Sequence, residues 1–193
     1  MKEKQSKSFN FTEAMERLIR HISKVCPEFS HLDSERIIVA TLQTRSPGLH
    51  GVYASVQPLR FKDGERMIKR RGRTYIMPEV RHDGKEILYI IYFALPRFLN
   101  LWFEEKLTTI FHELYHISPQ FNGDLRRFPG RNYAHGHSRK KYNELLQPLI
   151  AEYISNAEAK EMTEFLRQNF QELEERYGKV VGTKIKPPRP SLA

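Results

Sequence analysis

A short histidine–glutamate–histidine pattern is the part of this sequence best suited to chemistry. It reads His112-Glu113-Leu114-Tyr115-His116. In a helix, residues i and i+4 share a face, so both imidazoles could reach one zinc ion at about 2.0–2.1 Å. Glu113 would be rotated by about 100° and would stand beside the metal, where it suits a general base. The pattern predicts a zinc hydrolase in which Glu113 moves a proton from water to the leaving amine.

A catalytic zinc also needs a third protein ligand and an open position. Two histidines follow the motif in the sequence, His135 and His137, within Tyr-Ala-His-Gly-His-Ser at 133–138. We expect His135 to be the third ligand, with His137 as the alternate third ligand or as a neighbour of the site. Weaker candidates are carboxylates downstream of the motif, namely Asp124, Glu144 and Glu152.

Basic and aromatic residues near the motif could act on a substrate. The basic ones are Arg126, Arg127 and Arg131. Arg131 or Tyr133 could stabilise the oxyanion of a tetrahedral intermediate or bind a substrate carboxylate. For two of the three arginines we favour a structural role, in ion pairs with Asp124 or the acidic C-terminal helix. Tyr115 could also donate to the oxyanion, or it could pack against a sheet.

Helices that would position the motif follow from apolar residues at spacings of three and four. They are predicted over about 11–25, 96–117, 138–155 and 157–176. Asn10 suits the N-cap of the first helix, and Pro148 should kink the third. The second helix would carry the motif, with Trp102 in the core.

Strands are predicted between the first two helices, where β-branched and aromatic residues alternate with turn residues. They cover about 36–42, 51–56, 73–77 and 87–92. The segment Lys62–Arg71 contains Asp63-Gly64 and is typical of a hairpin tip. Its cations include Arg66, Lys69, Arg70 and Arg71. This basic loop is either a solvated surface or a site for an anionic partner.

Composition bounds the class of protein. A chain of 193 residues with 39% hydrophobic residues can build one folded domain. We expect a loose N-terminus over 1–9, a single metallopeptidase domain over 10–177 and a basic, Pro-rich tail over 178–193 whose end is extended or disordered. The net charge of +9 suggests attraction to polyanions such as nucleic acid, or only a soluble basic surface.

Cysteine content and hydropathy point to a cytoplasmic protein. The single cysteine, Cys26, excludes an internal disulfide and a zinc ribbon made of cysteines. The first residues contain no apolar run typical of a signal peptide. No stretch approaches the roughly 18 apolar residues of a membrane span, so no membrane partner is expected.

The residues around the motif resemble those of the phage-type and prokaryotic metallopeptidases, which are similar to the SprT-like zincins. The resemblance lies in His112–Pro119, Phe121–Phe128, Gly130-Arg131 and His135-Gly136. The SprT-like group takes its third ligand from a His-Gly pair, which implies His135 here. The resemblance also implies a zincin-like α+β fold, with a small mixed or antiparallel sheet packed on the metal-binding helix and with N- and C-terminal helices.

The resemblance is incomplete, and it says less about the substrate than about the metal. SprT-like proteins that act at DNA often carry a Cys-rich zinc ribbon, which this sequence lacks, and the run Gly-Asp-Leu-Arg-Arg at 123–127 departs from the usual residues. We therefore predict a zinc metallopeptidase acting on a protein or peptide, held by backbone pairing to an edge strand. One alternative is a nucleic-acid-associated SprT-like zinc protein that acts on DNA-bound protein. Another is a non-catalytic zinc interaction module.

Overall fold

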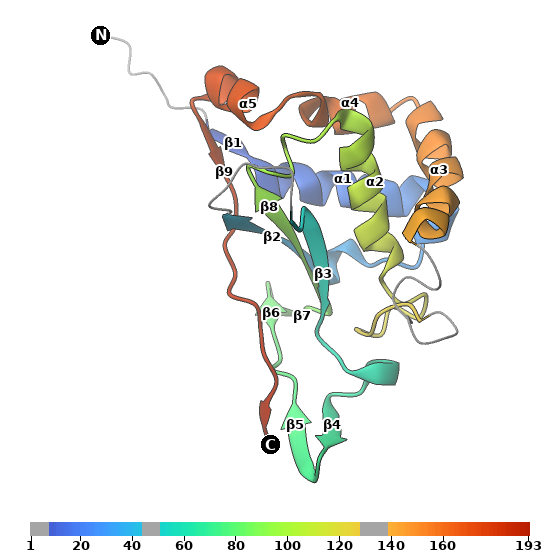
Figure 1. Ribbon diagram of the computed structural model, residues 1–193, viewed down its shortest axis with the longest axis vertical. Coiled ribbons are helices and arrows are strands. Elements are labelled where there is room, and N and C mark those ends of the chain that lie inside the picture. The colour runs from blue at the N-terminus through green and yellow to red at the C-terminus, as the bar shows by residue number, and fades with distance from the viewer. Residues whose placement is uncertain (1–7, 44–50, 128–138) are drawn as a thin grey trace.

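A three-stranded mixed sheet lies at the centre of the fold (Figure 1). The computed structural model describes residues 8–43, 51–127 and 139–193. In the sheet, β8 (Tyr89–Leu95) lies between β2 (Ile37–Gln43), which is parallel to it, and β3 (Ala54–Pro58), which is antiparallel. Every residue of β8 is buried, because the sheet is covered on both faces. Strand β3 forms one edge of this sheet.

Helices cover one face of the sheet. The described helices are α1 (Phe11–Val25), α2 (Phe103–Tyr115), α3 (Arg139–Ser155), α4 (Ala159–Thr163) and α5 (Phe170–Tyr177). Val39, Ile91 and Phe93 of the sheet share a core with Leu18 of α1 and Leu107 of α2. The mixture of helices and small sheets confirms the α+β class.

The C-terminal segment covers part of the opposite face. Ile90 and Tyr92 of β8 belong to a second apolar cluster, against which Ile185 packs. Just before Ile185, the carbonyl of Thr183 accepts a hydrogen bond of 2.7 Å from the N–H of Thr41. The segment also contains β9 (Lys179–Val181), parallel to β1 (Ser8–Asn10), and β10 (Ser191–Leu192). From Lys179 onward the backbone forms only these two short strands and irregular segments.

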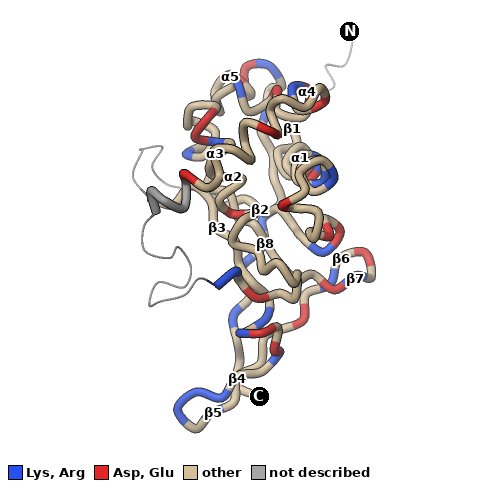
Figure 2. Tube along the Cα trace, turned by 90° about the vertical axis from the view of Figure 1, so that its right-hand side faces the viewer, with Lys and Arg blue, Asp and Glu red and all other residues tan. Residues whose placement is uncertain are grey.

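A β-hairpin extends away from the body of the molecule (Figures 1 and 2). It consists of β4 (Met67–Arg70) and β5 (Arg73–Ile76), and β10 pairs with the base of β5. Its tip is at residues 71–72, at the C-terminal end of the predicted segment Lys62–Arg71 and not at Asp63-Gly64. Those residues instead belong to a 3₁₀ turn, Lys62–Gly64. A second, shorter hairpin joins β6 (Arg81–His82) and β7 (Lys85–Glu86).

Helix α2 begins later than periodicity predicts. Phe103 is its first residue, and the N–H of Trp102 donates to the Glu105 carboxylate at 3.1 Å, which caps the helix. Trp102 is 79% exposed, so its predicted place in the core is wrong. The buried apolar residues just before the helix include Phe98, Leu99 and Leu101.

The predicted helix over 157–176 is interrupted. Between α4 and α5 the chain forms the 3₁₀ helix η4 (Glu164–Arg167). Asn169 then accepts from the N–H of Glu172 at 2.9 Å, and the Glu172 carboxylate accepts from the N–H of Asn169 at 2.7 Å. This reciprocal capping starts a new helix, α5. In the described part of the chain, no helix has the length and apolar character needed to cross a membrane.

Candidate metal centre

Helix α2 places the motif in its last turn. Leu107, Ile110 and Leu114 are buried in the core shared with the sheet. His112 lies in the final turn, and His116 is the C-cap residue, with its N–H donating to the carbonyl of His112 at 3.2 Å. The motif therefore sits where the helix ends and an irregular loop begins.

The two histidines point toward each other. The Nε2 atoms of His112 and His116 are 3.0 Å apart, and the rings are nearly perpendicular at 83°. Two imidazoles that share one tetrahedral zinc at about 2.0–2.1 Å have nitrogens about 3.3 Å apart. The pair would therefore have to open by only about 0.3 Å, so these two donors fit the metal. Their binding of a metal stays a prediction.

Glu113 is directed to the edge strand of the sheet. Its carboxylate Oε2 accepts a hydrogen bond of 2.7 Å from the backbone N–H of Val56 in β3. Glu113 is only 8% exposed, and a charge-assisted bond of this length holds its side chain in one orientation. Helix α2 therefore brings the predicted base and the edge of β3 into direct contact.

The chain turns back beside the motif after α2. Ile117 forms an antiparallel bridge with Leu125, and the N–H of Ser118 donates to the carbonyl of Asp124 at 3.2 Å. The N–H of Arg126 then donates to the carbonyl of His116 at 2.7 Å. Residues 117–126 thus form a closed loop, which we call the return loop. Its end lies next to the second histidine.

Asp124 holds the return loop together and is not directed to the histidines. Its carboxylate accepts from the N–H groups of Asp63 at 3.0 Å and Leu125 at 2.8 Å, and from the guanidinium of Arg127 at 2.9 and 2.8 Å. Asp124 is 5% exposed. Because four donors already occupy this buried carboxylate, we assign it a structural role.

The buried Tyr89 ties the return loop to the central strand. Its hydroxyl donates to the carbonyl of Asp124 at 2.8 Å and accepts from the N–H of Gly123 at 2.9 Å. Burial raises the pKa of Tyr89 far above its usual value, so the hydroxyl stays neutral and can serve both bonds. Gly123 has φ +86°, and a Cβ there would lie 2.4 Å from Cγ of Arg60, so this position requires glycine.

Two of the three loop arginines have the structural role that the sequence favoured. Arg127 pairs with Asp124, as described above. Arg126 pairs with Glu28 at 2.8 Å and not with the C-terminal helix, and its guanidinium lies 3.8 Å from the ring centre of Tyr115. Tyr115 is half-buried under this cation. The side chain of Arg126 therefore packs the loop against the end of α2.

Several predicted site residues lie outside the described residues. These are Arg131, Tyr133, His135 and His137. Within residues 8–43, 51–127 and 139–193, no three histidine, cysteine or carboxylate side chains form a group that could hold a metal. The weaker candidates Glu144 and Glu152 are exposed on α3. His135 and His137 therefore stay the predicted third ligands.

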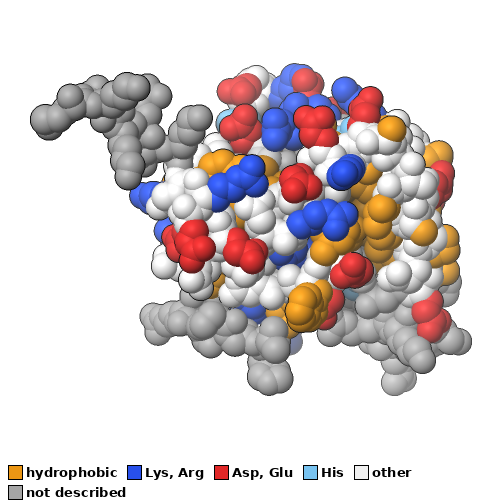
Figure 3. Space-filling model, turned by 90° about the horizontal axis from the view of Figure 1, so that it is seen from above, with side chains coloured by type: hydrophobic (Ala, Val, Ile, Leu, Met, Phe, Trp, Pro, Cys, Tyr) orange, Lys and Arg blue, Asp and Glu red, His pale blue; other side chains and the backbone are white. Residues whose placement is uncertain are grey.

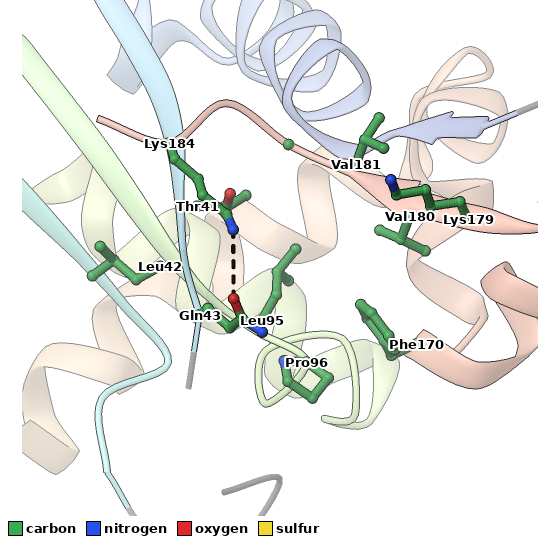
Figure 4. Close-up of a pocket in the computed structure, with 11 residues that line it drawn as sticks. Thr41, Leu42, Gln43, Leu95, Pro96, Phe170, Lys179, Val180, Val181 and Lys184 are labelled. Atoms are coloured by element: carbon green, nitrogen blue, oxygen red, sulfur yellow. Dashed lines mark hydrogen bonds between the residues drawn. The ribbon is translucent and has the colours of Figure 1, made fainter. Parts of the chain in front are cut away.

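A cavity of about 330 Å³ lies beside β2, at the edge of the central sheet opposite to β3, and Figure 4 shows the residues that line it. Thr41 and Gln43 of β2, Phe170 of α5 and the segment 179–182 line it. Two of the lining residues are joined by a hydrogen bond, in which Lys184 Nζ donates to the Gln43 side chain at 3.4 Å. None of the motif residues lines this cavity, so we do not assign it to the metal centre.

Two residues of this region could not be identified from the sequence. Val56 contributes only its backbone N–H to the contact with Glu113. A motif made of side chains cannot indicate which backbone N–H will bind Glu113. Tyr89 belongs to a strand in which all seven residues are buried. The buried run of β8 carries two phenols, those of Tyr89 and Tyr92, and a buried hydroxyl needs a partner, but this signal does not single out Tyr89.

Comparison with known proteins gives one family match. Searches of curated proteins and of solved structures return no match to this chain. The family model described as "Putative phage metallopeptidase" matches residues 7–147, which include α1, the central sheet and the motif. A metallopeptidase family implies a metal cofactor, and the histidine pair on α2 offers donors for it. The chain belongs to this phage metallopeptidase family.

Proposed function

We propose that the chain is a zinc-dependent metallopeptidase of zincin type that hydrolyses peptide bonds. In this proposal His112, His116 and His135 hold the metal, with His137 as the alternate third ligand, and Glu113 is the general base. The convergence of the two Nε2 atoms to 3.0 Å beside a buried glutamate carries the proposal. Paired imidazoles with a neighbouring carboxylate suit zinc hydrolysis.

Glu113 would move the proton in this reaction. When bound, zinc would supply Lewis-acid polarisation of the attacking water and of the substrate carbonyl. Glu113 would take the proton from water and return it to the leaving amine. The hydrogen bond from the Val56 N–H keeps the carboxylate oriented before substrate arrives, which lowers the cost of reaching the reactive geometry.

The edge of β3 offers a place for an extended substrate. Val56 directs its N–H away from β8, so by alternation Ala54 turns its backbone groups to the same side. An extended peptide could add to this side by backbone pairing. Because Glu113 contacts the same edge, a peptide bound along β3 would pass beside the proposed base.

The return loop supports His135 as third ligand by bringing the chain back to the motif. Arg126 is bonded to His116, and Arg127 is the last described residue before the segment that contains His135. From Arg127 to His135 the chain advances eight positions, which can span up to about 28 Å. His135 is therefore within reach of the histidine pair.

Elemental analysis combined with a peptidase assay tests this proposal. We expect one zinc per chain in the wild type and in Glu113→Gln, and loss of zinc in His116→Ala and His135→Ala. His137→Ala should keep the metal. Glu113→Gln should lose peptide hydrolysis by a factor of about 10² or more. Glu104→Gln, an exposed glutamate on the same helix, is the matched control and should keep full activity.

Two outcomes would count against the proposal. Full activity of Glu113→Gln would remove its role as base. If the wild type takes up no metal when purified without chelator and then supplied with zinc, the histidine pair is not a metal site. If metal binds but no peptide is cleaved, the non-catalytic zinc module becomes the better interpretation.

A further inference from the structure

The hairpin of β4 and β5 concentrates positive charge at its tip. Lys69, Arg70, Arg71 and Arg73 are all exposed within five consecutive positions. Among the described residues, no carboxylate lies within ion-pair distance of these four cations. By contrast, Arg66 and Arg81, on either side of the hairpin, pair with Glu79 at 3.0 and 2.5 Å. The tip is therefore a charged surface that the described fold does not neutralise.

Two of these cations lie directly opposite each other. Arg70 and Arg73 are partners in the ladder between β4 and β5. Cross-strand partners have Cβ atoms about 4.5–5.5 Å apart, and like charges placed so destabilise a hairpin. In the shorter hairpin the pair that flanks the turn is His82 and Lys85, and the next pair opposes Arg81 to Glu86, which is favourable. The repulsion at the tip of the longer hairpin would be relieved by an anion bound between the two guanidinium groups.

The turn at the tip also has an arginine where the backbone conformation favours another residue. Both hairpins have a two-residue turn with positive φ at both positions, Arg71-Gly72 (49° and 74°) and Asp83-Gly84 (48° and 78°). This type of turn favours Asn-Gly or Asp-Gly. The shorter hairpin follows that preference, whereas the longer one has an arginine in a left-handed conformation that costs roughly 1 kcal/mol. The sequence therefore retains a cation at the tip against the local preference of the backbone.

The shape of the hairpin suits a large anionic partner. The tip stands clear of the body and is coloured as one positive region in Figure 2, whereas the face seen in Figure 3 mixes both signs of charge. At the tip the ribbon has only two strands, since β10 pairs with residues 75–76 at its base. A two-stranded ribbon fits the major groove of duplex DNA. The C-terminal segment beside it adds exposed Lys186 and Arg189.

We propose that the β4–β5 hairpin binds the phosphate backbone of duplex DNA, with Arg70, Arg71 and Arg73 at the tip and Lys69 on the opposite face of the ribbon. Cations that face phosphates release counterions, which supplies affinity without reading base sequence. This proposal does not depend on the metal centre, because neither the hairpin nor its ligand involves the motif.

Salt-dependent binding of the full-length protein to a labelled DNA duplex of about 20 base pairs tests it. Four phosphate contacts predict a slope of log affinity against log salt near −3.6, or about a hundredfold loss of affinity between 50 and 200 mM salt. Arg70→Gln with Arg73→Gln should reduce the slope by about 1.8 and weaken binding at least about tenfold at 50 mM. The control pair Arg17→Gln with Arg20→Gln removes two exposed cations from α1 and should leave the slope unchanged.

Three results would overturn this proposal. The first is no binding to the duplex at 50 mM salt. The second is equal loss of affinity in both double variants, which would mean that net charge alone attracts DNA. The third is hairpin-dependent binding to vesicles of phosphatidylserine and phosphatidylcholine without binding to the duplex, which would identify a membrane surface instead. Thermal melting of each variant checks that the fold is retained.

Discussion

Replacing Asp124 with alanine should destabilise the protein by removing the acceptor at the centre of the return loop. The carboxylate accepts from two backbone N–H groups, those of Asp63 and Leu125, and from two nitrogens of Arg127. The site is buried, so water cannot fully replace the carboxylate. Loss of the acceptor leaves these donors unpaired.

The expected cost follows from the exposure of each donor. Each backbone N–H left without its acceptor costs roughly 1 kcal/mol. The Arg127 side chain is 35% exposed and can regain water, so the loss of its ion pair adds only about 1 kcal/mol. The sum is about 3 kcal/mol, which for a chain of this length lowers Tm by about 6–12 °C. Asp124→Asn keeps one acceptor oxygen and should cost about half as much.

Urea unfolding and thermal melting measure this effect. Asp33→Ala is the matched control, because Asp33 accepts a single exposed hydrogen bond, from the N–H of Glu35 at 3.0 Å, and its loss should cost about 1 kcal/mol or less. Asp124→Ala should also weaken zinc uptake, since the return loop ends beside His116. An unfolding midpoint of Asp124→Ala equal to that of Asp33→Ala would refute the assigned role of the carboxylate.

Three further predictions concern single residues. Lys106 is 2% exposed and donates to two backbone carbonyls at 2.8 Å, and burial lowers its pKa from 10.5 to about 8. Between pH 8 and 10.5 the unfolded chain binds more protons than the folded one, so the unfolding free energy of the wild type should rise with pH relative to that of Lys106→Met. Parallel curves of unfolding free energy against pH for the two proteins would contradict this. Gly123→Ala should lower the urea midpoint and zinc uptake together, because its Cβ would collide with Arg60; an unchanged midpoint would show that the loop adapts. Arg71→Asn should stabilise the protein by about 1 kcal/mol in urea unfolding while weakening DNA binding, and a loss of stability would show that the turn does not strain arginine.

Elements defined by local signals were predictable from the sequence. The first helix was expected over 11–25 with Asn10 as its cap, and the structure has α1 at these residues, with Asn10 accepting from the N–H of Glu13 at 3.2 Å. Capping and apolar periodicity both act within a few residues, so one sequence contains the whole signal. The same holds for the motif, whose histidines meet because their spacing matches one helical turn.

Features that depend on distant contacts were not predictable. The contact between Glu113 and Val56 joins residues 57 positions apart through a backbone group. The sequence has two sites, Asp63-Gly64 and Arg71-Gly72, at which the chain could reverse to form a hairpin. The chain reverses at Arg71-Gly72. Asp63-Gly64 instead lies against the return loop, because the N–H of Asp63 donates to the Asp124 carboxylate. Local turn propensity could not decide between them, because a tertiary contact selects one.

The return loop connects the two proposed activities through one set of contacts. The segment 59–64 leads from the edge strand β3 toward the hairpin, and the N–H of Arg60 donates to the carbonyl of Gly123 at 3.0 Å. Together with the bond from Asp63 to Asp124, this fixes the root of the hairpin to the loop that follows His116. A perturbation of Asp124 should therefore reach both the metal centre and the orientation of the hairpin. Replacements at the hairpin tip, by contrast, break none of these contacts and should leave zinc content unchanged.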